Sequence, residues 1–301
     1  MPDTLAPEAR ELLAGIAADS PEWRPWTTLL EEALRSAADP ASSSLVVELP
    51  DAHPPSAPLL DGATVLLDAR AANRRLSRLL ASAADSKSGA ESASLGRAAH
   101  RKDLDALTLI EASFRQDGEA VAGIAEQLGV EPGSLGSIAA LAALPLLLTC
   151  GERLRKHVSA QWSEGYCPIC GAWPTLAEMR GLERARRLRC GRCAGDWAAP
   201  ILQCPYCRTS DHRVLGSLLT EDLGDSRKVD VCDSCRGYVK TLTTLSPWPA
   251  YRVPIEDLAT VDLDVIALER DYLRPAPPGY PVNVTVAPAT PTRRGLFSRR
   301  P

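Results

Sequence analysis

Four Cys-x-x-Cys pairs decide the fold of this 301-residue chain: Cys167-Pro168-Ile169-Cys170, Cys190-Gly191-Arg192-Cys193, Cys204-Pro205-Tyr206-Cys207 and Cys232-Asp233-Ser234-Cys235. The pairs are separated by 19, 10 and 24 residues. A two-residue spacer lets both thiolates of a tight turn face one point, and two such turns complete a tetrahedron around a metal at about 2.3 Å. The eight cysteines are therefore predicted to bind two metal ions.

The pairing of the four turns follows from the lengths between them. Pairing in sequence order gives one site from Cys167, Cys170, Cys190 and Cys193, and a second site from the remaining four cysteines, Cys204, Cys207, Cys232 and Cys235. Interleaved pairing stays open, although its longer crossings make it less favourable on loop-closure grounds. A thioredoxin-like dithiol would need a strand-to-helix context, and four clustered pairs argue against it.

Glycines and apolar residues near the pairs suggest how this segment folds. Gly171, Gly191 and Gly237 lie where a tight turn often needs a positive φ. Trp173 and Trp197 follow the first two pairs and are interpreted as cover for the metal site. The segment has few other large apolar residues, so metal binding should supply much of its folding free energy. Each closed site contributes on the order of 10 kcal/mol at neutral pH.

The rest of the chain predicts an α+β protein in four parts. Residues 1–160 show helical periodicity, for example at Leu107, Ile110 and Phe114, and should form a helical domain. Residues 161–250 contain short strand-like pieces and should form tandem zinc-ribbon-like four-cysteine metal-binding modules. Residues 251–274 should form a C-terminal helix with Leu258, Val261, Val265 and Leu268 on one face, and residues 275–301 a disordered, basic, proline-rich tail.

Three local features modify the helical part. Residues 39–58 and 82–96 are rich in Ser with Pro or Ala and are interpreted as loops, the second of them as a candidate for disorder. Pro145 should kink or restart the apolar helix that leads to the first cysteine pair. Cys150, in this apolar segment, is interpreted as a small buried hydrophobe.

Composition limits the possible functions. The net charge of −4 argues against strong nonspecific binding to nucleic acid, and only the arginines from Arg180 to Arg192 support a nucleic-acid-binding ribbon protein. The apolar run from Ile138 to Leu148 is about half of the ~20 residues that span a bilayer, so no membrane insertion is expected. The N-terminal residues have neither a basic start nor an apolar run, so export is not expected and the cysteines should be reduced.

Other possible sites receive less support from the sequence. His212 follows Cys207 by five residues, but the cysteines already complete two tetrahedra. No Ser/His/Asp arrangement, phosphate-binding glycine loop or carboxylate pair indicates an active site, so the chain is not expected to be an enzyme. Spacing alone does not choose between iron and zinc.

The residues around the pairs resemble the FdhE family of formate dehydrogenase accessory proteins. The resemblance covers residues 138–274, and it rests on Gly165 to Gly171 with Trp173-Pro174, Leu188 to Cys193 with Trp197, Cys232 to Cys235 with Tyr238-Val239-Lys240-Thr241, and Glu256 to Thr260 with Leu263-Asp264. The basic tail and the 24 residues between the third and fourth pairs depart from the family pattern.

The resemblance implies a cytoplasmic maturation factor. Such a protein binds the catalytic subunit of an exported formate dehydrogenase before twin-arginine export, without turnover of its own. The family's C-terminal module looks like paired rubredoxin-type folds, which implies iron as the metal of the eight cysteines. An electron-transfer role for that iron remains an alternative.

Overall fold

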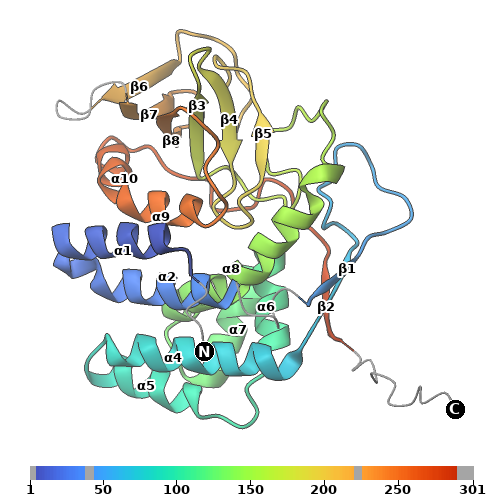
Figure 1. The fold of residues 1–301 in the computed structure, drawn as a ribbon, viewed down its shortest axis with the longest axis vertical. Coiled ribbons are helices and arrows are strands. Elements are labelled where there is room, and N and C mark those ends of the chain that lie inside the picture. Colours follow the sequence, from blue (N-terminus) through green and yellow to red (C-terminus); the bar gives the residue numbers. More distant parts are fainter. Residues whose placement is uncertain (1–4, 38–43, 220–225, 290–301) are drawn as a thin grey trace, which may run out of the picture.

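A helical layer and a larger sheet are stacked on one another in this protein. The computed structural model describes residues 5–37, 44–219 and 226–289. Figure 1 shows the helical layer below, the six-stranded sheet above, and two C-terminal helices between them. The predicted α+β class, with helices and two four-cysteine clusters, is confirmed.

The N-terminal part is helical as predicted, with α8 at its centre. Its helices are α1 (Pro7–Asp19), α2 (Arg24–Ala37), α4 (Ala69–Asp85), α5 (Gly89–Ala99), α6 (Ala106–Arg115), α7 (Gly118–Leu128) and α8 (Pro132–Leu154), with 3-10 turns at Pro21–Trp23 and Arg155–His157. Helix α8 contacts α2, α4, α6 and α7. It continues through Pro145, so the helix does not restart there.

Carboxylates define where several of these helices begin. The side chains of Asp68, Asp105, Asp117 and Glu131 accept hydrogen bonds from backbone N–H groups in the first turns of α4, α6, α7 and α8. These N–H groups have no partner inside the helix, so a side-chain acceptor stabilises each helix end by about 1 kcal/mol. Helix α8 is long and apolar enough to cross a membrane, but 61% of its apolar window is buried, as expected of a core helix.

The expected loop at residues 82–96 is wrong, because this stretch contains the end of α4 and most of α5. Ala83, Ala84 and Leu95 are buried in the core. The hydroxyl groups of Ser92 and Ser94 donate to the backbone carbonyls of Ala84 and Glu91, which satisfies the polar groups that suggested a loop.

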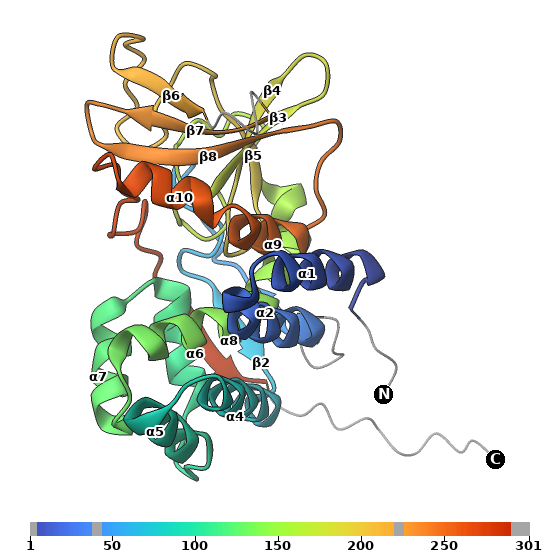
Figure 2. The ribbon, with the colours of Figure 1, turned by 90° about the vertical axis from the view of Figure 1, so that its left-hand side faces the viewer.

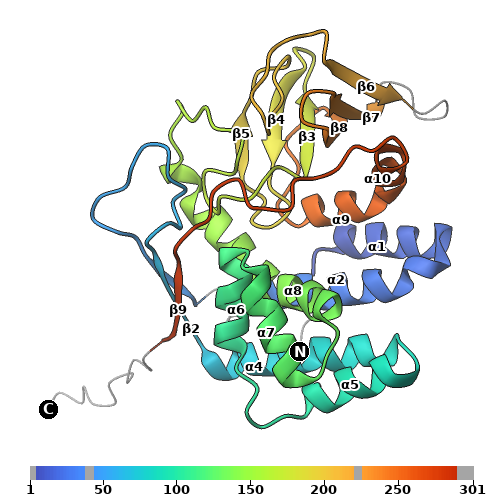
Figure 3. The ribbon, with the colours of Figure 1, turned by 180° about the vertical axis from the view of Figure 1, so that it is seen from behind.

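A small sheet of β1 (Val46–Glu48), β2 (Thr64–Leu67) and β9 (Thr285–Pro288) borders the helices. Strand β1 lies within the expected loop at residues 39–58, of which 39–43 are outside the described residues. Strand β9 pairs in parallel with β2, and Figure 3 shows it beside β2 after the chain has crossed the molecule from α10.

The prediction of a disordered tail from residue 275 is wrong over β9. Val282, Val284 and Val286 alternate along the chain and are buried. Thr285 donates its N–H to the carbonyl of Ala63, and Ala289 donates to the carbonyl of Leu67 in β2. Pro288, which has no N–H, therefore lies at a position where the strand pairing needs no donor. Residues 290–301, the remainder of the predicted tail, lie outside the described residues.

The large sheet carries the cysteine pairs. Its strands are β3 (Leu176–Arg180), β4 (Ala185–Arg189), β5 (Asp196–Ala198), β6 (Leu215–Leu219), β7 (Arg227–Cys232) and β8 (Gly237–Thr244). Their order is β5-β4-β3-β8-β7-β6, with β3 and β8 parallel and every other neighbouring pair antiparallel. The two expected modules are therefore two antiparallel halves of one continuous sheet.

The C-terminal helix is interrupted. It consists of α9 (Arg252–Ala259) and α10 (Val261–Leu268), separated at Thr260, whose hydroxyl donates to the carbonyl of Glu256. Figure 2 shows α9 beside α1, and α10 beneath the strands of the sheet. Leu263 and Ala267 of α10 are buried against Val229 and Val231 of β7.

Candidate metal centres

Each Cys-x-x-Cys pair folds as a tight turn, called here a knuckle. In the first three knuckles the residue after the second cysteine donates its N–H to the carbonyl of the first cysteine, at 2.9 to 3.0 Å. In the first two, a backbone N–H also donates to sulfur: Ile169 to Cys167 Sγ and Arg192 to Cys190 Sγ, both at 3.4 Å. The backbone bonds close each turn, and the N–H bonds to sulfur stabilise negative charge on Cys167 and Cys190.

The positive φ of each knuckle lies on the residue that follows its second cysteine. These residues are Gly171 (φ 72°), Ala194 (54°), Arg208 (63°) and Arg236 (57°). The prediction for Gly171 is confirmed, whereas Gly191 and Gly237 do not have positive φ. These two positions require glycine because a larger residue would clash. A Cβ at Gly191 would lie 2.3 Å from Thr175 Oγ1, and a Cβ at Gly237 would lie 2.4 Å from the Tyr206 ring.

Gly171→Ala should destabilise the protein by about 2 to 4 kcal/mol, more than Gly181→Ala. Both glycines have positive φ, which costs about 1 kcal/mol or more for alanine. The new Cβ of Gly171→Ala would also lie 2.3 Å from the carbonyl oxygen of Tyr280, whereas that of Gly181→Ala meets nothing within 4 Å. Thermal unfolding of both variants measures the difference, and equal losses would contradict this account.

The eight sulfurs form the two groups that pairing in sequence order predicts. In each group the four Sγ atoms lie within 4.8 Å of one another. Sγ–Sγ distances are 3.4 Å for Cys167–Cys193 and Cys170–Cys190, 3.6 Å for Cys204–Cys235 and 3.7 Å for Cys207–Cys232.

These distances fit four thiolates around one metal ion. A tetrahedron with metal–sulfur bonds of about 2.3 Å has edges of about 3.8 Å, close to the values found. A disulfide would need about 2.05 Å, so the cysteines are free thiols. Two such clusters could hold two metal ions, and four thiolate donors suit zinc and iron equally. The assignment of the eight cysteines as ligands remains a prediction.

The electrostatics of the first cluster also favour a cation. Burial, followed by hydrogen bonds to Cys170 and Cys190, raises the pKa of Cys167 well above its usual value. Burial opposes ionisation of Cys190 too, yet hydrogen bonds from Cys167, Cys170 and Cys193 lower its pKa well below the usual value. The Cys167 thiol is therefore hard to ionise unless a cation is bound beside it.

The first cluster is fully enclosed. All four cysteines are buried, and they belong to the same continuous core as Phe114, Ile138 and Leu146 of the helical layer. A Cβ at Gly151 of α8 would lie 1.9 Å from the carbonyl oxygen of Cys193, so only glycine lets α8 approach this knuckle. The first centre is thus a joint between helices and sheet.

Backbone and side-chain bonds fix this joint. Leu59 and Leu60 donate their N–H groups to the carbonyls of Pro168 and Ile169, at 2.8 and 2.9 Å. The guanidinium of Arg192 donates to the carbonyls of Ser113 and Phe114 at the end of α6. The first knuckle is therefore held by the loop before β2, and the second by the end of α6.

The second cluster is open to solvent. Cys204 and Cys232 are buried, but Cys207 and Cys235 are exposed. Burial raises the pKa of Cys235 to about 11. Burial also acts to raise the pKa of Cys207, but a backbone hydrogen bond from Thr209 and hydrogen bonds with the neighbouring thiols outweigh it, so the pKa of Cys207 is lowered. Two of the four sulfurs can thus meet water or another molecule.

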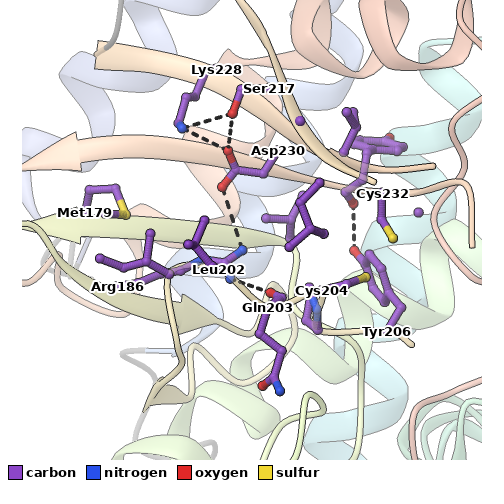
Figure 4. A pocket seen from close by; sticks show the side chains of 18 residues that line it. Met179, Arg186, Leu202, Gln203, Cys204, Tyr206, Ser217, Lys228, Asp230 and Cys232 are labelled. Atoms are coloured by element: carbon purple, nitrogen blue, oxygen red, sulfur yellow. Dashed lines mark hydrogen bonds and ion pairs between the residues drawn. The ribbon is translucent and has the colours of Figure 1, made fainter. Parts of the chain in front are cut away.

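A pocket of about 320 Å³ lies beside the second cluster (Figure 4). Cys204, Tyr206 and Cys232 form one side of it. The other side is polar: Asp230 accepts hydrogen bonds from Ser217 and Thr241 and pairs with Lys228 at 3.0 Å. At the rim, Ile201 and Leu202 are 58% and 61% exposed.

Aromatic rings connect the two centres. The Trp173 ring packs edge-on against Tyr206 of the third knuckle at 5.2 Å and against Tyr166 at 6.2 Å. A Cβ at Gly165 would lie 1.7 Å from the carbonyl oxygen of Pro205, so the backbones also touch here. Trp173 therefore links the knuckles, while Trp197 is buried in the core that holds the first cluster.

The arginines from Arg180 to Arg192 mostly bind within the protein. Arg180 and Arg187 pair with Asp196 at 2.7 Å, and Arg189 pairs with buried Glu178. Arg186 donates to the carbonyls of Pro200 and Gln203. Arg192 binds α6. Most of the arginines that supported nucleic-acid binding therefore pair with groups of the protein itself.

A buried charge network near the second cluster includes residues of the motifs that carry the family resemblance. The Lys240 ammonium, completely buried, pairs with Asp257 at 2.7 Å and with Asp264 at 2.8 Å. Arg274 pairs with the same two carboxylates, and Tyr238 donates to Asp264. The network fastens α9 and α10 to β8, next to the fourth knuckle, and sequence spacing gave no sign of it.

The remaining candidate residues lie outside both clusters. Cys150 is buried in α8 as predicted, and burial raises its pKa to about 12, so it is an unreactive thiol. His212 is exposed on the loop after the third knuckle and belongs to neither group of sulfurs.

Comparison with known proteins gives relatives over part of the chain. No protein-family model matches the chain. The chain is similar to the "Protein FdhE homolog" of Aquifex aeolicus (strain VF5), with 30% identity over 134 residues, and to that of Stutzerimonas stutzeri (strain A1501), with 35% over 125. The matches cover 43% and 40% of this chain and 46% and 38% of those proteins. The chain thus spans less than half the length of these relatives.

The fold extends the similarity over most of the chain. The crystal structure of the FdhE protein from Pseudomonas aeruginosa superposes with a TM-score of 0.55 and 20% sequence identity. The superposition covers 90% of this chain and 92% of that one, so the helical layer belongs to the shared fold.

Proposed function

We propose, from the premise that the chain belongs to the FdhE family, that it is a formate dehydrogenase accessory protein. It binds the catalytic subunit of an exported formate dehydrogenase in the cytoplasm, before twin-arginine export. It performs no turnover of its own. The metal-containing half of the large sheet at Cys204, Cys207, Cys232 and Cys235 provides the contact.

The observation that carries this proposal is the exposure of the second cluster beside a pocket. The first cluster is sealed in the core and suits a structural ion. Around the second cluster, exposed sulfurs, the apolar rim at Ile201 and Leu202 and the polar wall at Asp230 form a mixed surface. Such surfaces are typical of transient protein contacts.

Rubredoxin-like electron transfer is the second candidate function, and the exposure of Cys207 and Cys235 favours it. An iron ion held there would lie at the surface, where electrons can be exchanged. Visible absorption that bleaches on reduction would identify iron, whereas zinc is colourless. A maturation factor without redox chemistry should bind its partner equally well with either metal.

Capture from cells tests the proposal. Affinity-tagged protein should retain a formate dehydrogenase catalytic subunit that carries its signal sequence. The Cys235→Ser variant should retain at least about tenfold less of this subunit than the wild type does. Cys150→Ala, which alters a buried cysteine outside both clusters, is the matched control and should behave as the wild type. No recovery by the wild type under reducing, metal-replete conditions would overturn the proposal.

A further inference from the structure

One arginine in the pocket beside the second cluster has no close counter-charge among the described residues. Arg186 of β4 lines this pocket, and its side chain is 3% exposed. Its Nη1 donates to the carbonyls of Pro200 at 3.0 Å and Gln203 at 2.8 Å. Figure 4 shows the side chain extending from its strand toward Asp230. The guanidinium is therefore buried and held in a fixed position.

The other edge of this guanidinium is available to a ligand. Its Nε–H is buried and has no hydrogen-bond partner within the described parts of the chain. Its Nη2 lies 3.7 Å from Asp230 Oδ2, an ion pair that is longer than a hydrogen bond. Nε and Nη2 together form the edge through which an arginine binds a carboxylate with two parallel hydrogen bonds.

Asp230 does not fill this position, because its oxygens accept shorter hydrogen bonds from other groups. Ser217 donates to Oδ1 at 2.9 Å, and Lys228 pairs with the same oxygen at 3.0 Å. Thr241 donates to Oδ2 at 2.7 Å. Burial lowers the pKa of Arg186 below its ordinary value, since desolvation outweighs the attraction of Asp230. The charge of Arg186 is thus incompletely compensated.

Two other buried arginines differ in this respect. Arg189 and Arg274 also bury an Nε without a hydrogen-bond partner in the described chain. However, Arg189 pairs closely with Glu178, and Arg274 pairs with Asp264 at 2.8 Å. Burial removes the hydration of a cation, so a buried guanidinium without a close anion is unfavourable. A bound anion would provide the missing charge at Arg186.

The rest of the pocket indicates what the anion should carry. Apart from its two cysteines, the charged side chains that line it are two cations, Arg186 and Lys228, and one anion, Asp230. Its volume of about 320 Å³ lies at the low end of the range for small-ligand sites, about 300 to 1,000 Å³. Its apolar side chains include those of Met179, Ile201, Leu202 and Leu215. One excess positive charge beside apolar side chains suits a monoanion with a short apolar group.

We propose that this pocket binds a carboxylate that carries a small apolar group, with the carboxylate on the Nε and Nη2 edge of Arg186. The apolar group would contact Met179 and Leu202. The inference goes beyond the proposed function and does not depend on it. A free organic acid and the C-terminus of a peptide both offer this chemistry, and the experiment separates the two sources.

Ligand binding to full-length, metal-replete protein is the test. The probes are isocaproate and its neutral amide, which have the same apolar group. Saturation-transfer NMR titrations measure both affinities. Isocaproate should bind at least about tenfold more tightly than the amide, because only the carboxylate brings a negative charge and two equivalent acceptors to the guanidinium. Equal affinities would overturn the proposal.

Two exposed leucines localise the site without a change in the core. Leu202→Glu places a carboxylate at the rim of the pocket, where Leu202 is 61% exposed, and should weaken isocaproate binding about tenfold. The matched control is Leu182→Glu, because Leu182 is 96% exposed and does not line the pocket. It should bind within about twofold of the wild type. Equal binding by the two variants would contradict the proposed site.

Arg186→Lys tests the two-bond edge itself. This variant keeps the positive charge but loses the planar fork, so isocaproate should bind about tenfold more weakly while the metal content stays that of the wild type. Unchanged affinity would overturn the role of Arg186. The two leucine variants keep the test valid if Arg186→Lys does not fold.

A tripeptide that ends in leucine identifies the source of the carboxylate. Tighter binding of this peptide than of isocaproate, lost when its C-terminus is amidated, supports a chain terminus as the ligand. Binding of isocaproate at least as tight as that of the peptide supports a free organic acid. If the wild type captures the formate dehydrogenase subunit but shows no preference for a carboxylate, this inference fails while the proposed function stands.

Discussion

Cys190→Ser should release one metal ion and lower the unfolding temperature of the helical layer and the sheet together. Cys190 is buried in the core that contains Phe114 and Ile138, and its neighbour Arg192 binds the end of α6. A closed four-thiolate site contributes on the order of 10 kcal/mol, which is comparable with the whole stability of a domain of this size. Far-UV circular dichroism during heating, with elemental analysis, measures both effects.

Cys235→Ser is the matched comparison, because Cys235 belongs to the exposed cluster. This variant should also lose one ion, but its helical transition should stay within a few degrees of the wild type. Loosening should be confined to the half of the sheet formed by β6, β7 and β8. Equal destabilisation by the two variants, or a Cys190→Ser protein with full metal content, would contradict the assignment of a structural first site.

A chelator should remove the two metal ions in two phases that differ in rate by at least about a hundredfold. Cys207 and Cys235 are accessible to a chelator, whereas the four sulfurs of the first cluster are buried. Metal can leave the first cluster only when the joint between helices and sheet opens, and core segments open far less often than exposed ones. Stopped-flow mixing with a coloured chelator resolves the phases.

The assignment of the phases can be checked with the same variants. Cys235→Ser should lack the fast phase and keep the slow one. Acidification should accelerate both phases, because protonated thiols no longer bind metal. A single phase in the wild type, or a fast phase that persists in Cys235→Ser, would show that the two centres do not differ in accessibility.

Much of this architecture could be predicted from the sequence, because cysteine spacing and helical periodicity are local signals. The in-order grouping around Cys167 and Cys204 is found in the structure, and helices α6 and α7 lie where their apolar residues recur. The short strand-like pieces predicted between residues 161 and 250 correspond to strands β3 to β8.

The features that were missed depend on long-range contacts. Strand β9 forms because β2, more than 200 residues earlier, provides a pairing partner for Thr285 to Pro288. Nothing local at Lys240 indicates that Asp257 and Asp264 will surround it. Likewise, cysteine spacing carries no information on exposure, so the difference between a sealed first cluster and an open second one had to come from the fold.

The most direct test of the account is the metal content of purified, reduced protein. Two bound ions of iron or zinc per chain are expected, with one ion in Cys190→Ser and one in Cys235→Ser. Reduced protein that carries no such ion and still shows an ordered six-stranded sheet would contradict the claim that two four-thiolate centres hold this fold together.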